Sequence, residues 1–201
     1  MSRIIAGRAR GSRLRMPQGE RTRPTTDRVR EAFFSYLATW ADGAAAEPED
    51  QLSGVRFLDL YSGSGAMGLE AASRGAAEAV LVESHRPVVE LIKRNAAATT
   101  LADRATVHPF SVATFLAGEP QPFDVVWLDP PYSMPTDEVS AVLARIAEGW
   151  LASDGLVVVE RSRRDPPPQW PAPLRVRWSR RYGETELHFG RPAPHDSVRN
   201  P

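Results

Sequence analysis

Two polar segments, each placed directly after an apolar run, hold the residue types that could do chemistry. The first, residues 59–68, reads Asp-Leu-Tyr-Ser-Gly-Ser-Gly-Ala-Met-Gly. Glycines directly after a strand permit a tight turn and let the backbone approach a ligand where a side chain would collide. Gly63, Gly65 and Gly68 also satisfy G-x-G-x-x-G, and Glu83 lies 20 residues after Gly63, at the end of the next apolar run. An acid there fits the ribose hydroxyls of an adenosine cofactor, either a nicotinamide or an adenosyl-sulfonium.

The second segment, Asp129-Pro130-Pro131-Tyr132, follows the apolar run Phe123–Leu128. The two prolines fix φ and carry no N–H, and their carbonyls remain able to accept hydrogen bonds. The Asp129 carboxylate is a further acceptor, and Tyr132 offers a flat ring. Two acceptors and a ring suit a planar base with an exocyclic amine. Drawing both N–H bonds toward acceptors would turn the nitrogen lone pair toward an electrophilic methyl group, which favours the adenosyl-sulfonium cofactor.

These residues predict direct displacement at a sulfonium methyl, with no metal and no covalent intermediate. A base inside a duplex cannot reach such a pocket, so the target is expected to be single-stranded or flipped out. A nicotinamide oxidoreductase uses the same glycines, but it leaves Asp129–Tyr132 and the basic N-terminus unexplained. A non-catalytic RNA-binding or assembly protein, with arginines over an inactive pocket, is the alternative from another class.

The composition narrows the chemistry. The 201 residues include no cysteine, which excludes disulfides, thiolate zinc sites and a cysteine nucleophile. The four histidines show no metal-ligand spacing. No apolar run approaches the roughly 20 residues needed to cross a bilayer, and the N-terminus lacks the apolar core of a signal peptide. We therefore expect a cytoplasmic protein with no membrane partner.

The net charge of zero conceals an uneven distribution. Residues 1–30 hold nine arginines and two acids, and residues 160–182 hold seven arginines and two acids, whereas residues 31–159 hold seven basic and 18 acidic residues. Two arginine-dense ends are expected if both meet a polyanion. The N-terminal arginines predicted to contact RNA phosphates are Arg3, Arg8, Arg10, Arg13 and Arg15.

The apolar rhythm places these residues on an α/β scaffold. The expected strands are 55–60, 79–82, 106–110, 123–128 and 156–159, and the expected helices are 66–73, 87–98, 112–117 and 137–148. Alternating strands and helices predict a mostly parallel, Rossmann-like twisted sheet with helices on both faces. Such sheets bind ligands beyond the carboxyl ends of their strands, where both polar segments lie.

Smaller elements are expected at both ends of the chain. Extended runs at 2–6 and 12–16 predict a basic hairpin, and Thr26 is an N-cap candidate for an amphipathic helix that follows it. Segments 174–179 and 184–189 predict an antiparallel C-terminal hairpin. We therefore divide the chain into an N-terminal appendage at 1–40, a catalytic domain at 55–190, and a linker and tail at 41–54 and 191–201.

At these motifs the chain resembles the Rossmann-type S-adenosylmethionine-dependent amino-methyltransferases, whose cofactor loop matches Asp59–Gly65 and whose D/N-P-P-Y/F motif matches Asp129–Tyr132. Residues 4–7, 23–31 and 182–185 are similar to segments of the bacterial small-subunit ribosomal RNA guanine-N2 methyltransferase family. This resemblance covers residues 3 to about 190. It implies N2 methylation of guanine 966 of 16S rRNA, in RNA assembled with ribosomal proteins, by a protein expected to be a monomer.

The resemblance also implies roles for individual residues. The expected catalytic residues are Asp129, Pro130, Pro131 and Tyr132, with the Asp129 carboxylate and the Pro130 carbonyl holding N2 while Tyr132 stacks on the guanine. The expected cofactor-binding residues are Thr25, Asp59, Tyr61, Ser62, Gly63, Gly65, Glu83 and Ser111. Ser111 stands where many relatives have an acid that accepts from the adenine amine.

The first helix and the choice of base leave alternatives open. Arg28 and Arg30 are expected to contact RNA, although arginines on a helix also form solvated faces with acids such as Glu31. The D-P-P-Y motif does not distinguish between exocyclic amines, so an adenine-N6 methyltransferase on DNA or RNA is the alternative within the same chemistry.

Overall fold

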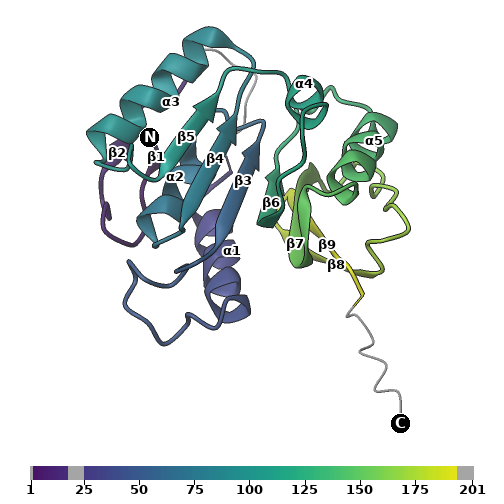
Figure 1. Ribbon diagram of the computed structural model, residues 1–201, viewed down its shortest axis with the longest axis horizontal. Coiled ribbons are helices and arrows are strands. Elements are labelled where there is room, and N and C mark those ends of the chain that lie inside the picture. The colour runs from purple at the N-terminus through teal and green to yellow at the C-terminus, as the bar shows by residue number, and fades with distance from the viewer. Residues whose placement is uncertain (1, 18–24, 194–201) are drawn as a thin grey trace.

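A seven-stranded sheet organises the chain, and the computed structural model describes residues 2–17 and 25–193 of it (Figure 1). The strand order is β5-β4-β3-β6-β7-β9-β8. The strands run β3 Arg56–Leu60, β4 Glu78–Val82, β5 Ala105–His108, β6 Phe123–Leu128, β7 Leu151–Ser162, β8 Val176–Tyr182 and β9 Thr185–Arg191. Strands β3 to β7 pair in parallel, while β9 and β8 add an antiparallel hairpin at one edge. This is the predicted arrangement.

Helices cover both faces of the sheet, as expected from the alternating pattern. They are α1 Asp27–Trp40, α2 Ala66–Ser73, α3 Arg86–Ala98, α4 Val112–Leu116 and α5 Thr136–Ala147. Because side chains alternate along a strand, Phe57 of β3 packs in one cluster with α1 and α2, and its neighbour Leu58 packs in another with α4 and α5. Figure 1 shows α4 and α5 over the part of the sheet near β6 and β7.

Helix α1 belongs to the core of the catalytic domain, and this differs from its predicted place in an appendage. The predicted N-cap is confirmed, because the Thr26 side chain accepts a hydrogen bond from the Val29 N–H at 3.3 Å. Phe33 and Phe34 are fully buried, and the Phe33 ring lies 4.7 Å from that of Trp127 on β6. Burying one such side chain contributes about 1.5–3 kcal/mol to the stability of the fold. The apolar pattern predicted that the helix has a buried face, but not which surface this face packs against.

The N-terminal hairpin is present with shorter strands than predicted. Strand β1 is Ser2–Arg3 and β2 is Arg13–Leu14. Ile4 and Leu14 are buried in a cluster that includes Leu69 of α2 and Ile92 of α3. The hairpin is therefore fixed to the domain by an apolar face and does not project from it.

Two other segments also differ from the predicted bounds. Strand β7 runs the full length of 151–162, beyond the predicted 156–159, and so carries polar residues at its carboxyl end. The predicted linker 41–54 is folded onto the domain through Leu52, which is fully buried. The predicted tail starts at residue 191, but Arg191 is the last residue of β9. Residues 194–201 of that tail and the motif residues Arg23 and Pro24 lie outside the described part of the chain. Within that part, no helix is long and apolar enough to cross a membrane.

Candidate active site

Both polar segments meet at the carboxyl ends of adjacent strands. Leu60 of β3 pairs with Leu128 of β6, and Leu128 in turn pairs with Val159 of β7. The residues that follow these positions therefore lie side by side at one edge of the sheet. They surround a cavity of about 320 Å³. The predicted site residues that line it are Thr25, Asp59, Tyr61, Ser62, Gly63, Glu83, Asp129 and Pro131.

The loop between β3 and α2 presents backbone to this cavity. Tyr61, Gly63 and Gly65 have positive φ values of 62°, 53° and 78°, a region that favours glycine. A Cβ built on Gly63 would meet no atom closer than 4.0 Å, so the space beside this glycine is open toward the cavity. The loop thus leaves room for a ligand against its main chain.

The other two glycines serve packing beneath the loop. A Cβ on Gly65 would lie 2.9 Å from Ile92 Cγ2, and one on Gly68 would lie 2.7 Å from Leu81 Cγ. Gly68 therefore lets α2 approach β4 closely, the role expected of the third glycine in this fingerprint. Gly65 does not line the cavity itself, so its predicted place among the cofactor-binding residues becomes one of shaping the loop.

Asp59 is a buried carboxyl at the base of the cavity. Its Oδ2 accepts a hydrogen bond from the Gly68 N–H at 2.9 Å, which fastens the start of α2 to the end of β3. Burial raises the pKa of Asp59 to about 7, and the nearby Glu83 carboxylate adds to the rise. The group is therefore poised between its neutral and charged forms near neutral pH.

Glu83, directly after β4, supports the same loop from beside the neighbouring strand. Its Oε2 accepts from the Gly63 N–H at 3.2 Å and its Oε1 from the His85 N–H at 2.8 Å. These bonds orient the carboxylate at the wall of the cavity, where it lies half-buried. Carboxylate lone pairs that remain are available to hydroxyl donors of a ligand.

A second group of acids lies at the ends of β6 and β7. Glu160 continues β7 beside Asp129, and its Oε2 accepts a hydrogen bond of 2.6 Å from the Thr25 hydroxyl. Glu160 and Thr25 are both buried. This bond brings Thr25, two residues before α1, against the carboxyl end of β7, which explains how Thr25 comes to line the cavity.

Asp129 holds a proton more tightly than an ordinary aspartate, because its pKa is raised. Desolvation raises its pKa well above the ordinary value, and the charges of Glu160 and Asp59 raise it further, while Arg161 opposes them. Arg161 also donates to the Met134 carbonyl at 3.1 Å and pairs with Asp165 at 2.9 Å. It thereby holds the chain that follows the D-P-P-Y segment.

The remaining residues of the D-P-P-Y segment differ in burial and in whether they line the cavity. Pro130 is buried, Pro131 lines the cavity, and Tyr132 is exposed with half of its surface accessible. Tyr132 borders a neighbouring hollow with Ser162, Arg164, Glu184 and Thr185. Tyr132 is not among the residues that line the cavity of Asp129, and its stacking on a base stays a prediction.

Ser111 does not line the cavity. Its hydroxyl caps α4 by accepting from the Thr114 N–H at 3.1 Å, and it also contacts the Thr114 hydroxyl at 2.7 Å. A short polar residue before a helix is a strong capping signal, and that local role accounts for Ser111. Its predicted adenine contact has no support in this geometry.

The N-terminal arginines differ in how much of their charge is available. Arg10, Arg13, Arg15 and Arg28 are exposed, whereas Arg8 is ion-paired with Asp103 and donates to the Thr100 carbonyl at 2.9 Å.

Arg3 is largely exposed and lies 3.9 Å from an Asp27 oxygen. The expectation that Arg30 contacts RNA is wrong, because its side chain is 1% exposed and is bound to Asp27, Glu70 and the Arg3 carbonyl.

Sequence reasoning missed several residues of this site. Met16 and Pro17 close the cavity from the N-terminal segment, and Ser84, His85, Val88 and Trp127 add to its walls. Glu160 and Arg161 could have been found from two charged residues directly after the apolar run 156–159. Met16 and Pro17 gave no such signal, because only tertiary contacts bring them to the site.

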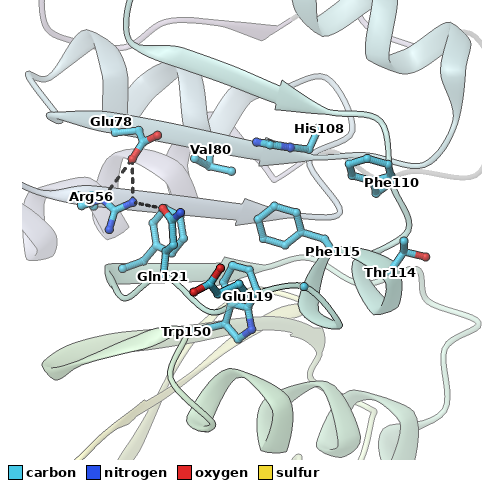
Figure 2. Close-up of a pocket in the computed structure, with 12 residues that line it drawn as sticks. Arg56, Glu78, Val80, His108, Phe110, Thr114, Phe115, Glu119, Gln121 and Trp150 are labelled. Carbon is cyan, nitrogen blue, oxygen red and sulfur yellow. Dashed lines mark hydrogen bonds and ion pairs between the residues drawn. The ribbon is translucent and has the colours of Figure 1, made fainter.

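A larger cavity lies elsewhere, on the face of the sheet next to α4 (Figure 2). It measures about 450 Å³ and is walled by aromatic rings, among them His108, Phe115 and Trp150. Figure 2 shows the Arg56–Glu78 ion pair at one end, with Gln121 bonded to Arg56. None of the predicted site residues lines this cavity.

Comparisons with known proteins match most of the described chain. The family described as Conserved hypothetical protein 95 matches residues 2–191. The ribosomal RNA small subunit methyltransferase D of Escherichia coli K12 is 38% identical over 170 residues, which are 85% of this chain and 79% of that protein.

Solved structures show the same fold. A hypothetical protein of Thermus thermophilus superposes with a TM-score of 0.75 at 34% identity, over 95% of this chain and 99% of the other. An RNA methyltransferase of Salinibacter ruber, in complex with S-adenosyl-L-homocysteine, has a TM-score of 0.59 at 18% identity, over 86% of this chain and 97% of the other. At that identity the likeness shows the fold alone.

Proposed function

The chain belongs to the family described as Conserved hypothetical protein 95, and from this membership and the site we propose that it is an S-adenosylmethionine-dependent methyltransferase of small-subunit ribosomal RNA. A relative at 38% identity carries the name ribosomal RNA small subunit methyltransferase D. The finer proposal is transfer to the exocyclic N2 of a guanine, of the guanine-966 type in 16S rRNA. We place this reaction in the cytoplasm.

The residues of the cavity fit the proposed cofactor. The open space beside Gly63 suits the amino-acid end of the molecule, where backbone N–H groups and the start of α2 are close. Glu83 suits the ribose hydroxyls as an acceptor. Bound there, S-adenosylmethionine would supply an electrophilic methyl group on a sulfonium.

The residues that follow β6 are proposed to bind and orient the exocyclic amine of the base. The Asp129 carboxyl and the Pro130 carbonyl accept the two N–H bonds of the amine and orient the nitrogen lone pair. The new bond joins N2 to the methyl carbon as the carbon–sulfur bond breaks, and N2 then releases one proton. The raised pKa of Asp129 makes its ionised form a better base for that proton. Alignment of the two reactants supplies much of the acceleration.

One observation carries the proposal. Asp129 and the glycine loop line the same cavity although Asp129 lies 66 positions after Gly63 in the chain. A nicotinamide enzyme would require the loop but not the Asp129 carboxyl beside it. Adenine-N6 transfer would use the same acceptors, so the identity of the base requires product analysis.

The exposed N-terminal arginines supply the proposed RNA contacts. Arg10, Arg13, Arg15 and Arg28 are exposed on the hairpin and the start of α1. Phosphate contacts of this kind fix position on the RNA without reading its sequence. We expect affinity for RNA to fall as salt concentration rises.

Two titrations and one transfer assay test the proposal. The protein is expected to bind S-adenosylhomocysteine in preference to NADH, and to transfer labelled methyl groups from S-adenosylmethionine to small-subunit ribosomal RNA. Preference for NADH would contradict the proposal and support the nicotinamide oxidoreductase alternative. Binding of RNA without binding of either cofactor would support a non-catalytic assembly protein.

A further inference from the structure

The N-terminal hairpin is held in place by polar side chains of other elements. Its own strands contribute two residues each, too few to fix its position. Glu70 of α2 accepts hydrogen bonds from the Ile5 N–H at 2.7 Å and the Ala6 N–H at 3.0 Å. Ser73 of the same helix accepts from the Ala9 N–H at 3.0 Å and donates to the Ala6 carbonyl at 2.6 Å. The direction of the hairpin is therefore set by the domain.

Asn95 of α3 makes a contact of a different kind. Its Oδ1 accepts from the Arg15 N–H at 2.9 Å, and its Nδ2 donates to the Arg15 carbonyl at 3.0 Å. The same Nδ2 donates to the Ser64 carbonyl at 3.0 Å. Asn95 is 1% exposed, so these bonds do not compete with water and both amide hydrogens are used. One planar amide thus joins the end of the hairpin to the glycine loop.

Both partners of Asn95 lie next to functional groups. Ser64 stands between Gly63 and Gly65, in the loop proposed to hold the amino-acid end of the cofactor. Arg15 carries an exposed side chain on the proposed RNA surface, and it directly precedes Met16 and Pro17, which line the cofactor cavity. A shift of the loop and a shift of the hairpin therefore both act on this amide.

We propose that Asn95 is a positioning residue that couples the two binding sites, so that the cofactor and the RNA bind cooperatively. This inference rests on the proposed function. A cofactor that orders the glycine loop also fixes the position of the Ser64 carbonyl. Because Asn95 binds both this carbonyl and the backbone of Arg15, the backbone of Arg15 is fixed as well. The arginines of the hairpin then meet RNA in an ordered arrangement. By linkage, RNA must tighten cofactor binding by the same factor.

The test is a binding cycle on the full-length protein. The affinity for transcribed 16S rRNA is measured with and without saturating S-adenosylhomocysteine, and the affinity for S-adenosylhomocysteine with and without RNA. The wild type is expected to show the same mutual tightening in both directions, at least about fivefold. Asn95→Ala is expected to bring this factor close to one.

Two further variants separate coupling from general loosening of the hairpin. Asn95→Asp keeps the shape of the side chain and the acceptor for the Arg15 N–H but loses both hydrogen bonds donated by Nδ2. Its cooperativity factor between RNA and S-adenosylhomocysteine is therefore also expected to fall close to one. Ser73→Ala removes hairpin bonds without touching Ser64. It is expected to weaken RNA binding while the factor stays at its wild-type value.

The outcomes distinguish this inference from the proposed function. Independent binding of the two ligands to the wild type would overturn the coupling and leave the methyltransferase intact. A wild-type factor in the Asn95 variants would likewise remove Asn95 from the coupling. Failure of the wild type to bind S-adenosylhomocysteine at all would instead overturn the proposed function.

Discussion

Two of the cavities in the described part of this protein differ in volume and in the groups that line them, and the one with more reactive groups has the smaller volume. The larger, of about 450 Å³, lies over the face of the sheet, and its lining combines aromatic rings such as Phe115 and Trp150 with the Arg56–Glu78 ion pair. The smaller, of about 320 Å³, lies at the strand ends and gathers Asp59, Glu83, Asp129 and the glycine loop. The convergence of acceptors and exposed backbone is the reason for proposing the reaction at the smaller cavity, although its volume is the lower of the two.

The difference follows from where polar groups can be placed in a parallel sheet. Within the strands, side chains alternate between two apolar faces, and Leu58 and Val126 pack in the interior. At the carboxyl ends the chain leaves the sheet, so charged residues can point at a ligand without disrupting the core. The acids of the smaller cavity occupy such ends, and the comparison predicts that substitutions will matter there and not in the larger cavity.

The largest effect is expected from Asp129→Ala. Loss of a preorganised group aimed at the reacting atom costs roughly 10²–10³-fold in turnover. Methyl transfer to the RNA should fall by that factor while affinity for S-adenosylhomocysteine changes little. Asp137→Ala, which removes an exposed carboxylate in the first turn of α5, is the matched control and should retain activity. Wild-type turnover of the Asp129 variant would remove this residue from the mechanism.

Glu83→Ala should weaken binding of the cofactor without changing the methyl-transfer step itself. Hydrogen bonds to a charged group contribute about 1.5–3 kcal/mol, so affinity for S-adenosylhomocysteine should fall about tenfold to a hundredfold. Calorimetric titration measures this, with Glu90→Ala as control because Glu90 is exposed on α3 and pairs with Lys93. Equal affinities of the two variants would mean that Glu83 only braces the loop.

Asp59→Asn tests the burial of charge beneath the smaller cavity. Burial raises the pKa of Asp59 from 3.8 to about 7, so between these values the folded state binds more protons than the unfolded state. Stability of the wild type therefore falls as the pH rises through this window. The asparagine variant loses that dependence and can still accept from the Gly68 N–H.

Thermal unfolding at several pH values measures this effect. The Tm of Asp59→Asn relative to wild type should rise between pH 4 and 7 by at least about 2–4 °C, the shift given by 1 kcal/mol in a chain of this size, and then level off. A constant difference at all pH values would show that Asp59 is not buried as a titrating group.

The smallest effect is expected in the larger cavity. Glu119→Ala changes an exposed residue at its wall that does not line the smaller cavity. Turnover and cofactor affinity should stay within about twofold, as for surface substitutions away from special features. A loss comparable to that of Asp129→Ala would show that the larger cavity takes part in the reaction.

The sequence predicted the site where local pattern sufficed. The apolar run 123–128 ended at Asp129 and the glycines opened a helix at Ala66, and both bounds are found in the structure. These signals depend on residues close in the chain, so they can be recognised without knowing the fold.

Features that depend on tertiary contacts could not be predicted from the sequence. Arg28 and Arg30 look alike in the sequence, yet Arg28 is exposed and Arg30 is buried beside Glu70. The burial of Arg30 depends on α2 and the hairpin meeting around it. For the same reason, nothing in the sequence indicated that Asn95 would join Arg15 to Ser64.

The identity of the methylated atom tests the central claim most directly. The protein is incubated with small-subunit ribosomal RNA and methyl-labelled S-adenosylmethionine, and the RNA is then digested to nucleosides and analysed by mass spectrometry. We predict label in N2-methylguanosine, lost with Asp129→Ala. Label in N6-methyladenosine or a ring-carbon position, or no label in RNA despite bound cofactor, would contradict the proposal that Asp129 and Pro130 present a guanine amine for methylation.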